Sequence, residues 1–385
     1  MNSIGSVFHD FEPEIQVSSP GRINLIGEHT DYNNGFVFPA AIDKQIVFSL
    51  KRNGNLTACK VYSADFDKLL EFDLNSVGPS AEEWENYLLG VIHEIQKLDK
   101  KLRGFDCVLT SDLPIGAGVS SSAAMECGLA FGLNELFDLG LSKRDIVFLS
   151  QRAEHNFVGT RCGIMDQYAS VMSKEGHALL LDCQSVTHRC IPIDLSPYTL
   201  LLLNTRVSHN LASGEYNSRR ADCFEGVELL NQKTGMKLST LRDLSLEELK
   251  AHRDLLPPLI YRRCLYVLQE NQRVLNAAKA LSDNDLDKFG LLLYESHEGL
   301  QREYQVSCDE LDFLVDFSRD KTYVLGARMM GGGFGGCTLN LVRYDHLQDY
   351  ITEASQAYKA RFDIELQAIP VSPAPGTHLL NNQTL

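Results

Sequence analysis

The sequence predicts a two-domain protein of mixed α and β structure. Its 385 residues are enough for two domains of ordinary size. Strand-like and helix-like segments alternate through the first half, whereas helical patterns dominate after about residue 220. We therefore place the boundary within residues 190–205, which gives an N-terminal domain of residues 1–195 and a C-terminal domain of residues 196–385.

The N-terminal half is predicted to alternate between strands and helices. Runs rich in β-branched, aromatic and other apolar residues predict strands, and mostly apolar or amphipathic runs of greater length predict helices. In chain order these are strands at QIVFSL (45–50) and CKVYSA (59–64), a helix at 84–98, a strand at 105–114 that ends at a proline, and a helix at 121–139. A further helix begins at Ser142, where Ser-Lys-Arg-Asp has the pattern of a capping box.

The remaining elements extend from the last strands of the first half to the C-terminus. HALLLDC (177–183) and YTLLLLNT (198–205) predict strands, and a polar stretch at 208–220 follows the second of them. Ser245 and Glu248 form another capping box. Residues 324–342 are predicted to be a glycine-rich loop followed by a strand, and residues 362–385 can pack against either half.

Composition restricts the classes of ligand and the cellular compartment. The net charge of −15 disfavours a general nucleic-acid or anionic-membrane binder, which is usually basic, but it leaves room for an anionic small molecule held by loop amides. The ten cysteines are scattered, with no C-x-x-C pair, which favours free thiols over a zinc site or a disulfide scaffold. Without a recognisable signal sequence or a long apolar run, we expect a cytoplasmic protein.

The first informative motif is GRINLIGEHTDYNNG, residues 21–35. Arg22, Glu28, His29 and Asp31 surround and follow an apolar Ile-Asn-Leu-Ile run, and all four can form hydrogen bonds with a polar ligand. The glycines of this stretch are expected to let the backbone bend around that ligand. Polar loops usually face solvent without further function, so this motif alone indicates only a polar ligand.

The second motif is LPIGAGVSSSAAMECGLA, residues 113–130. A predicted strand leads into a loop with Gly116 and Gly118, and three serines then open a helix. Flexible glycines and the unpaired amides of a helix N-terminus together form a phosphate site. The motif is neither G-x-x-x-x-G-K-[ST] nor G-x-G-x-x-G. A serine that simply caps a core helix explains the pattern equally well.

Two further stretches carry candidate functional groups. MGGGFGGC (330–337) has five glycines among residues 331–336, a density that favours backbone wrapped around a ligand or another loop over a tight strand connection. Asp166 lies among Gly, Ile and Met, where a partly desolvated carboxylate can serve as a general base. Taken alone, Asp166 is better explained as a helix N-cap.

Together these stretches resemble the GHMP small-molecule kinases and, within them, the galactokinase family. GRINLIGEHTDYNNG resembles the galactokinase signature, LPIGAGVSSSAA the superfamily's phosphate loop, and GARMMGGGFGGC its third motif. EHNFVGTRCGIMDQYAS and HNLASGEYNSRR are similar to further galactokinase blocks. The motifs occur in order from about residue 18 to residue 340. A few residues differ from the commonest family choices, but none of the differences removes a group expected to touch ligand: Ile23, Asn34, Val119, Ala124 and Met330.

The resemblance implies an α+β fold with two domains. An N-terminal α/β domain, of the kind called ribosomal protein S5 domain 2-like, is expected to face a C-terminal ferredoxin-like domain, with the active site in the cleft between them. It also implies the reaction: ATP phosphorylates the C1 hydroxyl of α-D-galactose to give galactose 1-phosphate and ADP, the first committed step of galactose (Leloir) metabolism. We expect galactose, ATP and Mg²⁺ as small-molecule partners of a monomer, with no nucleic acid or membrane.

Site residues follow from the matching positions. Asp166 corresponds to the catalytic aspartate and Arg22 to the arginine beside it. The resemblance assigns sugar binding to Glu28, His29, Thr30, Asp31, Gly163 and Tyr216. It assigns Mg²⁺ binding to Ser122 and Glu154. The phosphate loop comprises Gly116, Ala117, Gly118, Val119, Ser120, Ser121 and Ser122. Ser63 and Trp84 are the candidates for adenine contacts, although Trp84 can equally be an anchor on a helix face.

Two alternatives remain open from the sequence. A kinase for a related sugar, such as N-acetylgalactosamine or arabinose, would share most of these motifs. A galactose sensor without catalysis would resemble the same family but would lack part of the serine-alanine stretch in the phosphate loop. Here residues 120–124 are uninterrupted, and both Arg22 and Asp166 are present. These features favour an active enzyme.

Overall fold

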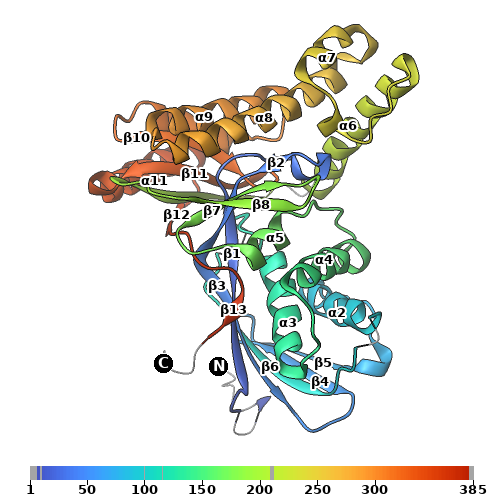
Figure 1. Cartoon of the computed structure of the whole chain (residues 1–385). Coiled ribbons are helices and arrows are strands. Elements are labelled where there is room, and N and C mark those ends of the chain that lie inside the picture. Colours follow the sequence, from blue (N-terminus) through green and yellow to red (C-terminus); the bar gives the residue numbers. More distant parts are fainter. Residues whose placement is uncertain (1–6, 9–10, 99, 115, 209–211, 381–385) are drawn as a thin grey trace.

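A six-stranded sheet forms the frame of the N-terminal half. The computed structural model describes residues 7–8, 11–98, 100–114, 116–208 and 212–380. In spatial order the sheet runs β13-β1-β3-β6-β4-β5, and all pairs are antiparallel except β4 with β6 (Figure 1). Its strands are β1 (Ile15–Asn24), β3 (Pro39–Arg52), β4 (Ala58–Ser63), β5 (Lys68–Asp73), β6 (Phe105–Ser111) and β13 (His378–Leu379).

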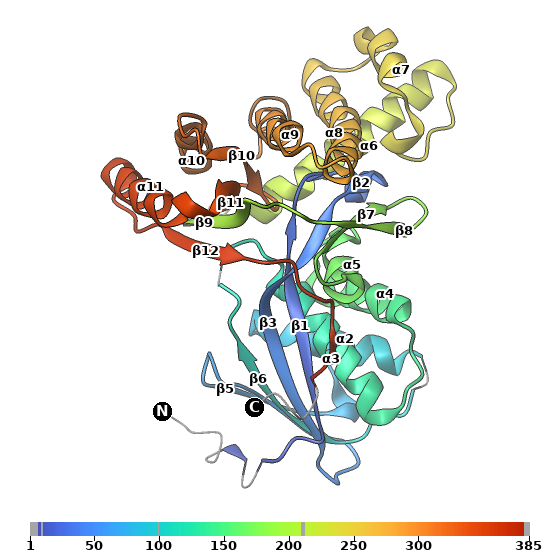
Figure 2. The same ribbon diagram turned by 60° about the vertical axis from the view of Figure 1, so that its left-hand side comes forward.

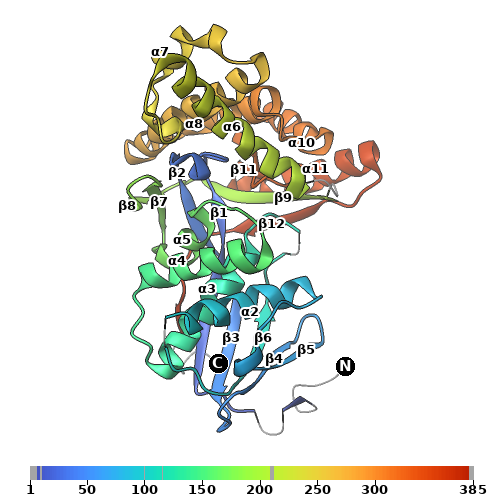
Figure 3. The same ribbon diagram turned by 90° about the vertical axis from the view of Figure 1, so that its right-hand side faces the viewer.

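A layer of helices covers one face of this sheet (Figure 3). The helices are α2 (Glu83–Gln96), α3 (Ser121–Phe137), α4 (Lys143–Ala153) and α5 (Met165–Met172). The nearly all-apolar α3 packs directly on β1 and β3. A Cβ atom on Gly128 would lie 2.1 Å from the ring of Phe48, so this glycine brings the helix close to the strands. The phosphate-loop motif, which precedes α3, is thereby held at the edge of a rigid core.

The C-terminal half is built on a second, four-stranded sheet. Its order is β10-β11-β9-β12, with β9 (Tyr198–Ser208), β10 (Val324–Met330), β11 (Gly335–Arg343) and β12 (Gln367–Val371). Figure 2 shows α9 (Leu286–Glu298), α10 (Asp309–Arg319) and α11 (Leu347–Phe362) together on one side of it. The other long helices are α6 (Ala212–Thr234) and α8 (Pro258–Ser282), with the short α7 (Leu246–Ala251) between them.

A small three-stranded sheet lies where the two halves meet. It consists of β2 (Phe36–Val37), β7 (His177–Asp182) and β8 (Thr187–Pro192), and α8 contacts all three strands. The chain then returns at its C-terminal end. Residues 372–380 leave β12 and bind the N-terminal sheet, where β13 pairs with β1 and Thr377 donates a backbone hydrogen bond to Ser170. The C-terminal segment, which was expected to pack against either half, thus contacts both. The predicted domain limits, residues 1–195 and 196–385, stay a prediction.

Most predicted elements are present within a few residues of their expected limits. Both capping boxes are confirmed, at Ser142 with Asp145 and at Ser245 with Glu248. The prediction for residues 324–342 was incomplete, because the strand β10 precedes the glycine loop and pairs with β11 as a hairpin. Parts of two quoted motifs, Ile115 and residues 209–211, lie outside the described residues, as do residues 381–385. No helix in the described part of the chain has the length and apolar character needed to cross a bilayer.

Candidate active site

Two cavities meet at one pair of side chains, Arg22 and Asp166. The larger cavity is lined by Arg22, Phe66, Glu83, Trp84, Tyr87, Pro114, Gly116, Ala117, Gly118, Val119, Ser120, Ser121, Ser122, Met125, Asp166, Gly331 and Gly332. The smaller cavity is lined by Arg22, Glu28, His29, Asp31, Cys162, Met165, Asp166, Tyr216, Gly331 and Gly332. The shared wall places Arg22 and Asp166 between two separate ligand spaces, which suits transfer of a group from one ligand to the other.

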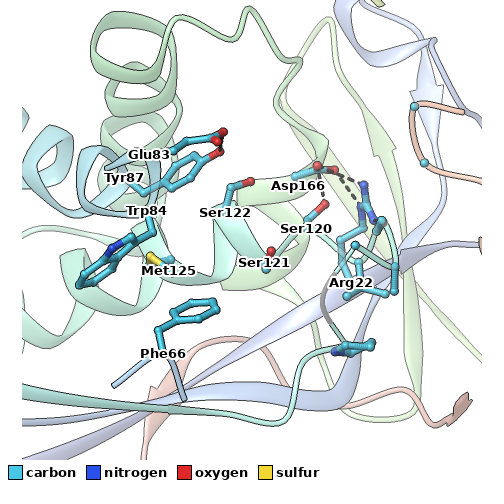
Figure 4. A pocket seen from close by; sticks show the side chains of 17 residues that line it. Arg22, Phe66, Glu83, Trp84, Tyr87, Ser120, Ser121, Ser122, Met125 and Asp166 are labelled. Carbon is cyan, nitrogen blue, oxygen red and sulfur yellow. Dashed lines mark hydrogen bonds and ion pairs between the residues drawn. The ribbon is translucent and has the colours of Figure 1, made fainter. Parts of the chain in front are cut away.

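The Arg22–Asp166 pair is held in a fixed geometry. Arg22 extends from β1, and its Nε and Nη2 donate to the two carboxylate oxygens of Asp166 at 2.8 and 3.1 Å (Figure 4). Its Nη1 donates to the carbonyl oxygen of Gly118 at 2.6 Å, and the Ser120 hydroxyl donates to Asp166 at 2.5 Å. Two-pronged pairing of this kind fixes the planes of both groups. The phosphate loop is therefore tied to the central pair.

Electrostatics keep Arg22 charged although it is buried. Burial alone would lower the pKa of Arg22, but the negative charges of Asp166 and Glu28 outweigh burial and raise it. Asp166 is in the first turn of α5, whose N-cap is Ile164, so the alternative of a capping aspartate is wrong. Its spatial neighbours are also polar rather than apolar, because the fold brings Arg22 and Ser120 to it from distant segments.

The phosphate-loop interpretation is favoured over simple helix capping. Ser120 is the N-cap residue of α3, but in the described structure its side chain makes no capping hydrogen bond and instead contacts Asp166. Its φ of 58° and the φ values of Gly116 and Gly118, 70° and 69°, turn the loop into the left-handed region. The first amides of α3 are thus left for a ligand in the larger cavity, where a helix N-terminus favours an anion.

Apolar and aromatic side chains form the far end of the larger cavity. In Figure 4 Trp84, Phe66 and Met125 lie together at one end, and Ser120, Asp166 and Arg22 lie at the other. A flat heterocycle fits between such side chains. Trp84 lines this end while also packing against the core, so both interpretations of Trp84 apply. Its Nε1 is shielded from solvent and has no hydrogen-bond partner among the described residues.

Sequence reasoning missed several residues of this cavity. They are Phe66, Glu83, Tyr87, Pro114 and Met125. Helical periodicity around Trp84 could have identified Tyr87, one turn further along α2. Ser63 is buried at the end of β4 and, in the described part of the chain, does not line the cavity, so its adenine contact stays a prediction.

Glu28 and His29 connect the smaller cavity to the glycine hairpin. The Glu28 Oε1 atom accepts the amide of Gly331 at 2.9 Å and pairs with the fully buried Arg328 at 3.0 Å. The His29 Nε2 atom lies 3.2 Å from the Gly332 carbonyl oxygen, which can only accept, so Nε2 carries the hydrogen. Nδ1 then accepts from the Tyr32 hydroxyl at 2.8 Å. Burial lowers the pKa of His29 to about 3, so the ring is neutral.

Asp31 occupies space that only a glycine leaves open. A Cβ atom at Gly163 would lie 1.8 Å from Asp31 Oδ2, so any other residue at position 163 would displace this carboxylate. Burial, followed by the charge of Asp166, raises the pKa of Asp31 to about 7. The ring of Tyr216 lies 5.3 Å from that of His29, between centroids, and closes the same cavity.

Thr30 and two missed residues complete the smaller cavity's surroundings. Thr30 is fully buried, and its hydroxyl lies near the carbonyl oxygens of Gly27 and Phe36 at 2.9 and 2.6 Å. Within the described residues Thr30 does not line the cavity, so its sugar contact stays a prediction. Cys162 and Met165 do line it, and each directly precedes a predicted site residue in the sequence.

The glycine-rich motif is both a tight strand connection and part of the cavity walls. It joins β10 to β11, and Gly331, Gly333 and Phe334 all have positive φ. A Cβ atom on Gly333 would lie 2.1 Å from the carbonyl oxygen of Val306, so this position requires glycine. A Cβ atom on Gly331 would be 3.5 Å from the carbonyl oxygen of Gly118, which places the two glycine motifs side by side at the Arg22–Asp166 pair.

Ser122 and Glu154 provide oxygen atoms that suit a hard cation. Ser122 lines the larger cavity. Glu154 is buried just after α4, accepts from the Gln167 amide at 2.6 Å, and in the described part of the chain lines neither cavity, so its metal contact stays a prediction. Burial and the charge of Asp166 raise the pKa of Glu154 to about 7, a destabilisation of the carboxylate that a divalent cation would relieve. Among the described residues, no group of three or more His, Cys, Asp and Glu could hold a metal. Mg²⁺ normally takes only one or two carboxylates together with substrate phosphates.

Comparison with known families agrees with this geometry. A model of the galactokinase galactose-binding signature matches residues 6–52, and models of the N-terminal and C-terminal domains of GHMP kinases match residues 86–174 and 277–360. The chain is 40% identical over 350 residues to the galactokinase of Thermosipho africanus, an alignment that covers 91% of this chain and 95% of that one. It is also 40% identical over 359 residues to the galactokinase of Chloroflexus aurantiacus, covering 93% and 91%.

Solved structures show the same relationship. The galactokinase of Lactococcus lactis complexed with galactose superposes with a TM-score of 0.93 at 34% identity and covers 98% of this chain and 97% of its own. The mevalonate kinase of Methanococcus jannaschii reaches a TM-score of 0.67 at 18% identity, covering 95% of this chain and 99% of its own, and shows a shared fold alone.

Proposed function

Since this chain belongs to the galactokinase family of the GHMP kinases, its activity is the ATP-dependent phosphorylation of galactose at the C1 hydroxyl, and we propose that Arg22 and Asp166 carry out the transfer. The products are galactose 1-phosphate and ADP. One observation carries the assignment of these residues: the ion pair, together with Gly331 and Gly332, lines both cavities. A phosphate from one side and a hydroxyl from the other would meet there.

Asp166 would act on the sugar hydroxyl and Arg22 on the developing charge. A sugar hydroxyl is a weak nucleophile near neutral pH, and a carboxylate oxygen within hydrogen-bond reach orients it and accepts its proton. Phosphoryl transfer depends mainly on positioning and on electrostatic stabilisation of a loose transition state. The Arg22 guanidinium, already fixed by Asp166 and the Gly118 carbonyl, supplies a positive charge that needs little rearrangement.

The smaller cavity is proposed to bind galactose. Several hydroxyls at fixed angles need several partners, for which we propose Glu28, Asp31 and Tyr216. Both ring nitrogens of His29 already bond to Gly332 and Tyr32, so His29 is proposed to contact the sugar as part of the cavity wall. Both contacts of the Glu28 carboxylate to the hairpin use Oε1, so Oε2 is the atom proposed to accept from the sugar. Gly163 contributes by leaving room for Asp31.

The larger cavity is proposed to bind ATP with Mg²⁺. The base would lie near Trp84, Phe66 and Met125, and the phosphates along residues 116–122. Ser122 and Glu154 would hold the cation, which, when bound, neutralises phosphate charge. We further propose that the enzyme is a cytoplasmic monomer.

A panel of sugars tests this function against the two alternatives. With ATP and Mg²⁺ in excess, ADP release is followed for galactose, N-acetylgalactosamine, arabinose and glucose. We expect galactose to give the highest kcat/KM. A higher value for another sugar would reassign the substrate. Tight binding of galactose and ATP without ADP release would identify a sensor.

A further inference from the structure

Helix α8 holds the sugar-binding loop, residues 25–36, from behind. The carboxylate of Glu270 accepts the backbone amide of Gly27 at 2.9 Å, and the side-chain oxygen of Asn271 accepts that of Phe36 at 2.8 Å. The hydroxyl of Tyr266 donates to the backbone carbonyl of Glu28 at 3.1 Å. Three side chains of one helix therefore fix the backbone at two adjacent residues near the start of the loop and at its last residue.

These three groups lie on the buried side of α8. Positions 266 and 270 are about one helical turn apart and share a face, and position 271 lies about 100° further round the helix, so the three side chains cover one broad side of α8. Tyr266 and Glu270 are fully buried and Asn271 is nearly so. Backbone N–H and C=O groups of a buried loop are costly to leave without hydrogen-bond partners. The three bonds from α8 therefore favour one conformation of the loop backbone over others.

The close packing of α8 is enough to require glycine at two positions of the loop. A Cβ atom at Gly27 would lie 2.7 Å from Val274, and one at Gly35 would lie 2.3 Å from the side-chain oxygen of Asn271. Gly27 also has a φ of 105°. The expectation that these glycines let the backbone bend around a ligand stays a prediction. They allow the loop to approach the helix closely.

Glu270 is itself anchored on both sides. Its Oε1 also accepts from the Ser296 hydroxyl of α9 at 2.6 Å, and its Oε2 accepts from Arg273 at 2.6 Å. A carboxylate that accepts from this many donors is held rigidly in one orientation. The position of Gly27, and with it the direction in which Glu28 and His29 leave the backbone, is thus set by the packing of α8 against α9.

We infer that Tyr266, Glu270 and Asn271 are positioning residues for galactose binding, acting through the backbone of residues 25–36. The inference rests on the proposed sugar site. These residues contact the backbone of the loop that carries Glu28, His29 and Asp31. Arg22 on β1 and Asp166 on α5 are held separately, by each other and by contacts to Gly118 and Ser120. Loosening the loop should therefore raise the KM for galactose and leave the KM for ATP unchanged.

Three variants of α8 test this inference. Tyr266→Phe removes only the hydroxyl that binds the Glu28 carbonyl. Asn271→Leu removes the acceptor of the Phe36 amide, and Asn271→Asp restores an oxygen at the same place. From the usual cost of a lost or unmade hydrogen bond, we expect the KM and the calorimetric Kd for galactose to rise roughly 5-fold in Tyr266→Phe and roughly 10-fold in Asn271→Leu. Asn271→Asp should stay close to wild type.

A matched control is Gln272→Leu, which removes an amide from the exposed face of the same helix. It should leave the KM and the Kd unchanged. If α8 has only a structural role, the thermal midpoint will fall in Tyr266→Phe and Asn271→Leu while the Kd for galactose stays at the wild-type value, and the inference is overturned. Failure of the proposed function gives a different result, because the wild-type protein itself would then show no galactose turnover. The role of α8 is decided separately, by comparing the calorimetric Kd for galactose between the variants and the wild type.

Discussion

Replacing Asp166 with Asn is expected to lower kcat for galactose phosphorylation by roughly 10²- to 10⁴-fold, the usual contribution of a positioned general base. The substitution keeps the size and planarity of the side chain but removes its basicity and its charge. The amide oxygen can still accept one hydrogen bond from Arg22, so the ion pair becomes a single hydrogen bond from the charged guanidinium to a neutral acceptor. Because Asp166 is proposed to act on the hydroxyl in the transition state, the KM values for galactose and ATP should change only slightly.

Steady-state kinetics at saturating ATP would measure this effect. Asp182→Asn, at the end of β7 and half-buried like Asp166, is the matched control and should retain wild-type kcat. Thermal melting of both variants checks that each is folded. Near-normal turnover by Asp166→Asn would show that Asp166 is not the base. A rise in the KM for galactose with unchanged kcat would instead limit Asp166 to sugar binding.

Replacing Arg22 with Ala should cause a comparably large loss, roughly 10³-fold in kcat, as seen when an arginine that stabilises phosphoryl transfer is removed. Arg22 is 4% exposed, and its loss would remove the positive charge beside Asp166 as well as the contact to Gly118. Arg22→Lys would restore the charge but not the two-pronged geometry, so we expect it to recover only a small part of kcat.

The KM for ATP separates a catalytic role of Arg22 from a role in nucleotide binding. We expect that KM to change much less than kcat, because most of the larger cavity is formed by other residues. Arg343→Ala, which removes an exposed arginine paired with Asp345, is the control and should behave as wild type. An effect confined to the KM for ATP would reassign Arg22 to nucleotide binding.

The sequence predicted the fold class and many of the residues that line the two cavities. It was less informative about what each loop and helix does in holding those residues in place. The two-domain GHMP fold is confirmed by the family and structure matches. Apolar periodicity and capping boxes identified most strands and helices, because these are local signals. The strand β10 was missed, since Gly326 and Arg328 interrupt its apolar pattern, and the Arg328 side chain is instead buried against Glu28.

Long-range packing accounts for what the sequence did not reveal. Tyr266, Glu270 and Asn271 lie more than 200 residues from the loop that they hold, and on their own they resemble any amphipathic helix. Phe66 is an exposed aromatic in a turn and becomes part of a cavity only once Trp84 and Met125 are placed beside it. The choice between phosphate loop and simple cap depended on the side-chain direction of Ser120, which only the fold determines.

The most direct test of the account is to identify the phosphorylated product of the wild-type protein. The protein is incubated with ATP, Mg²⁺ and galactose, and phosphorus NMR is used to assign the position of the new phosphate ester while ADP is quantified. We predict α-galactose 1-phosphate and ADP in equal amounts, because the Arg22–Asp166 pair stands between the two cavities. A phosphate ester at any other hydroxyl, or ADP formed with inorganic phosphate and no sugar phosphate, would contradict it.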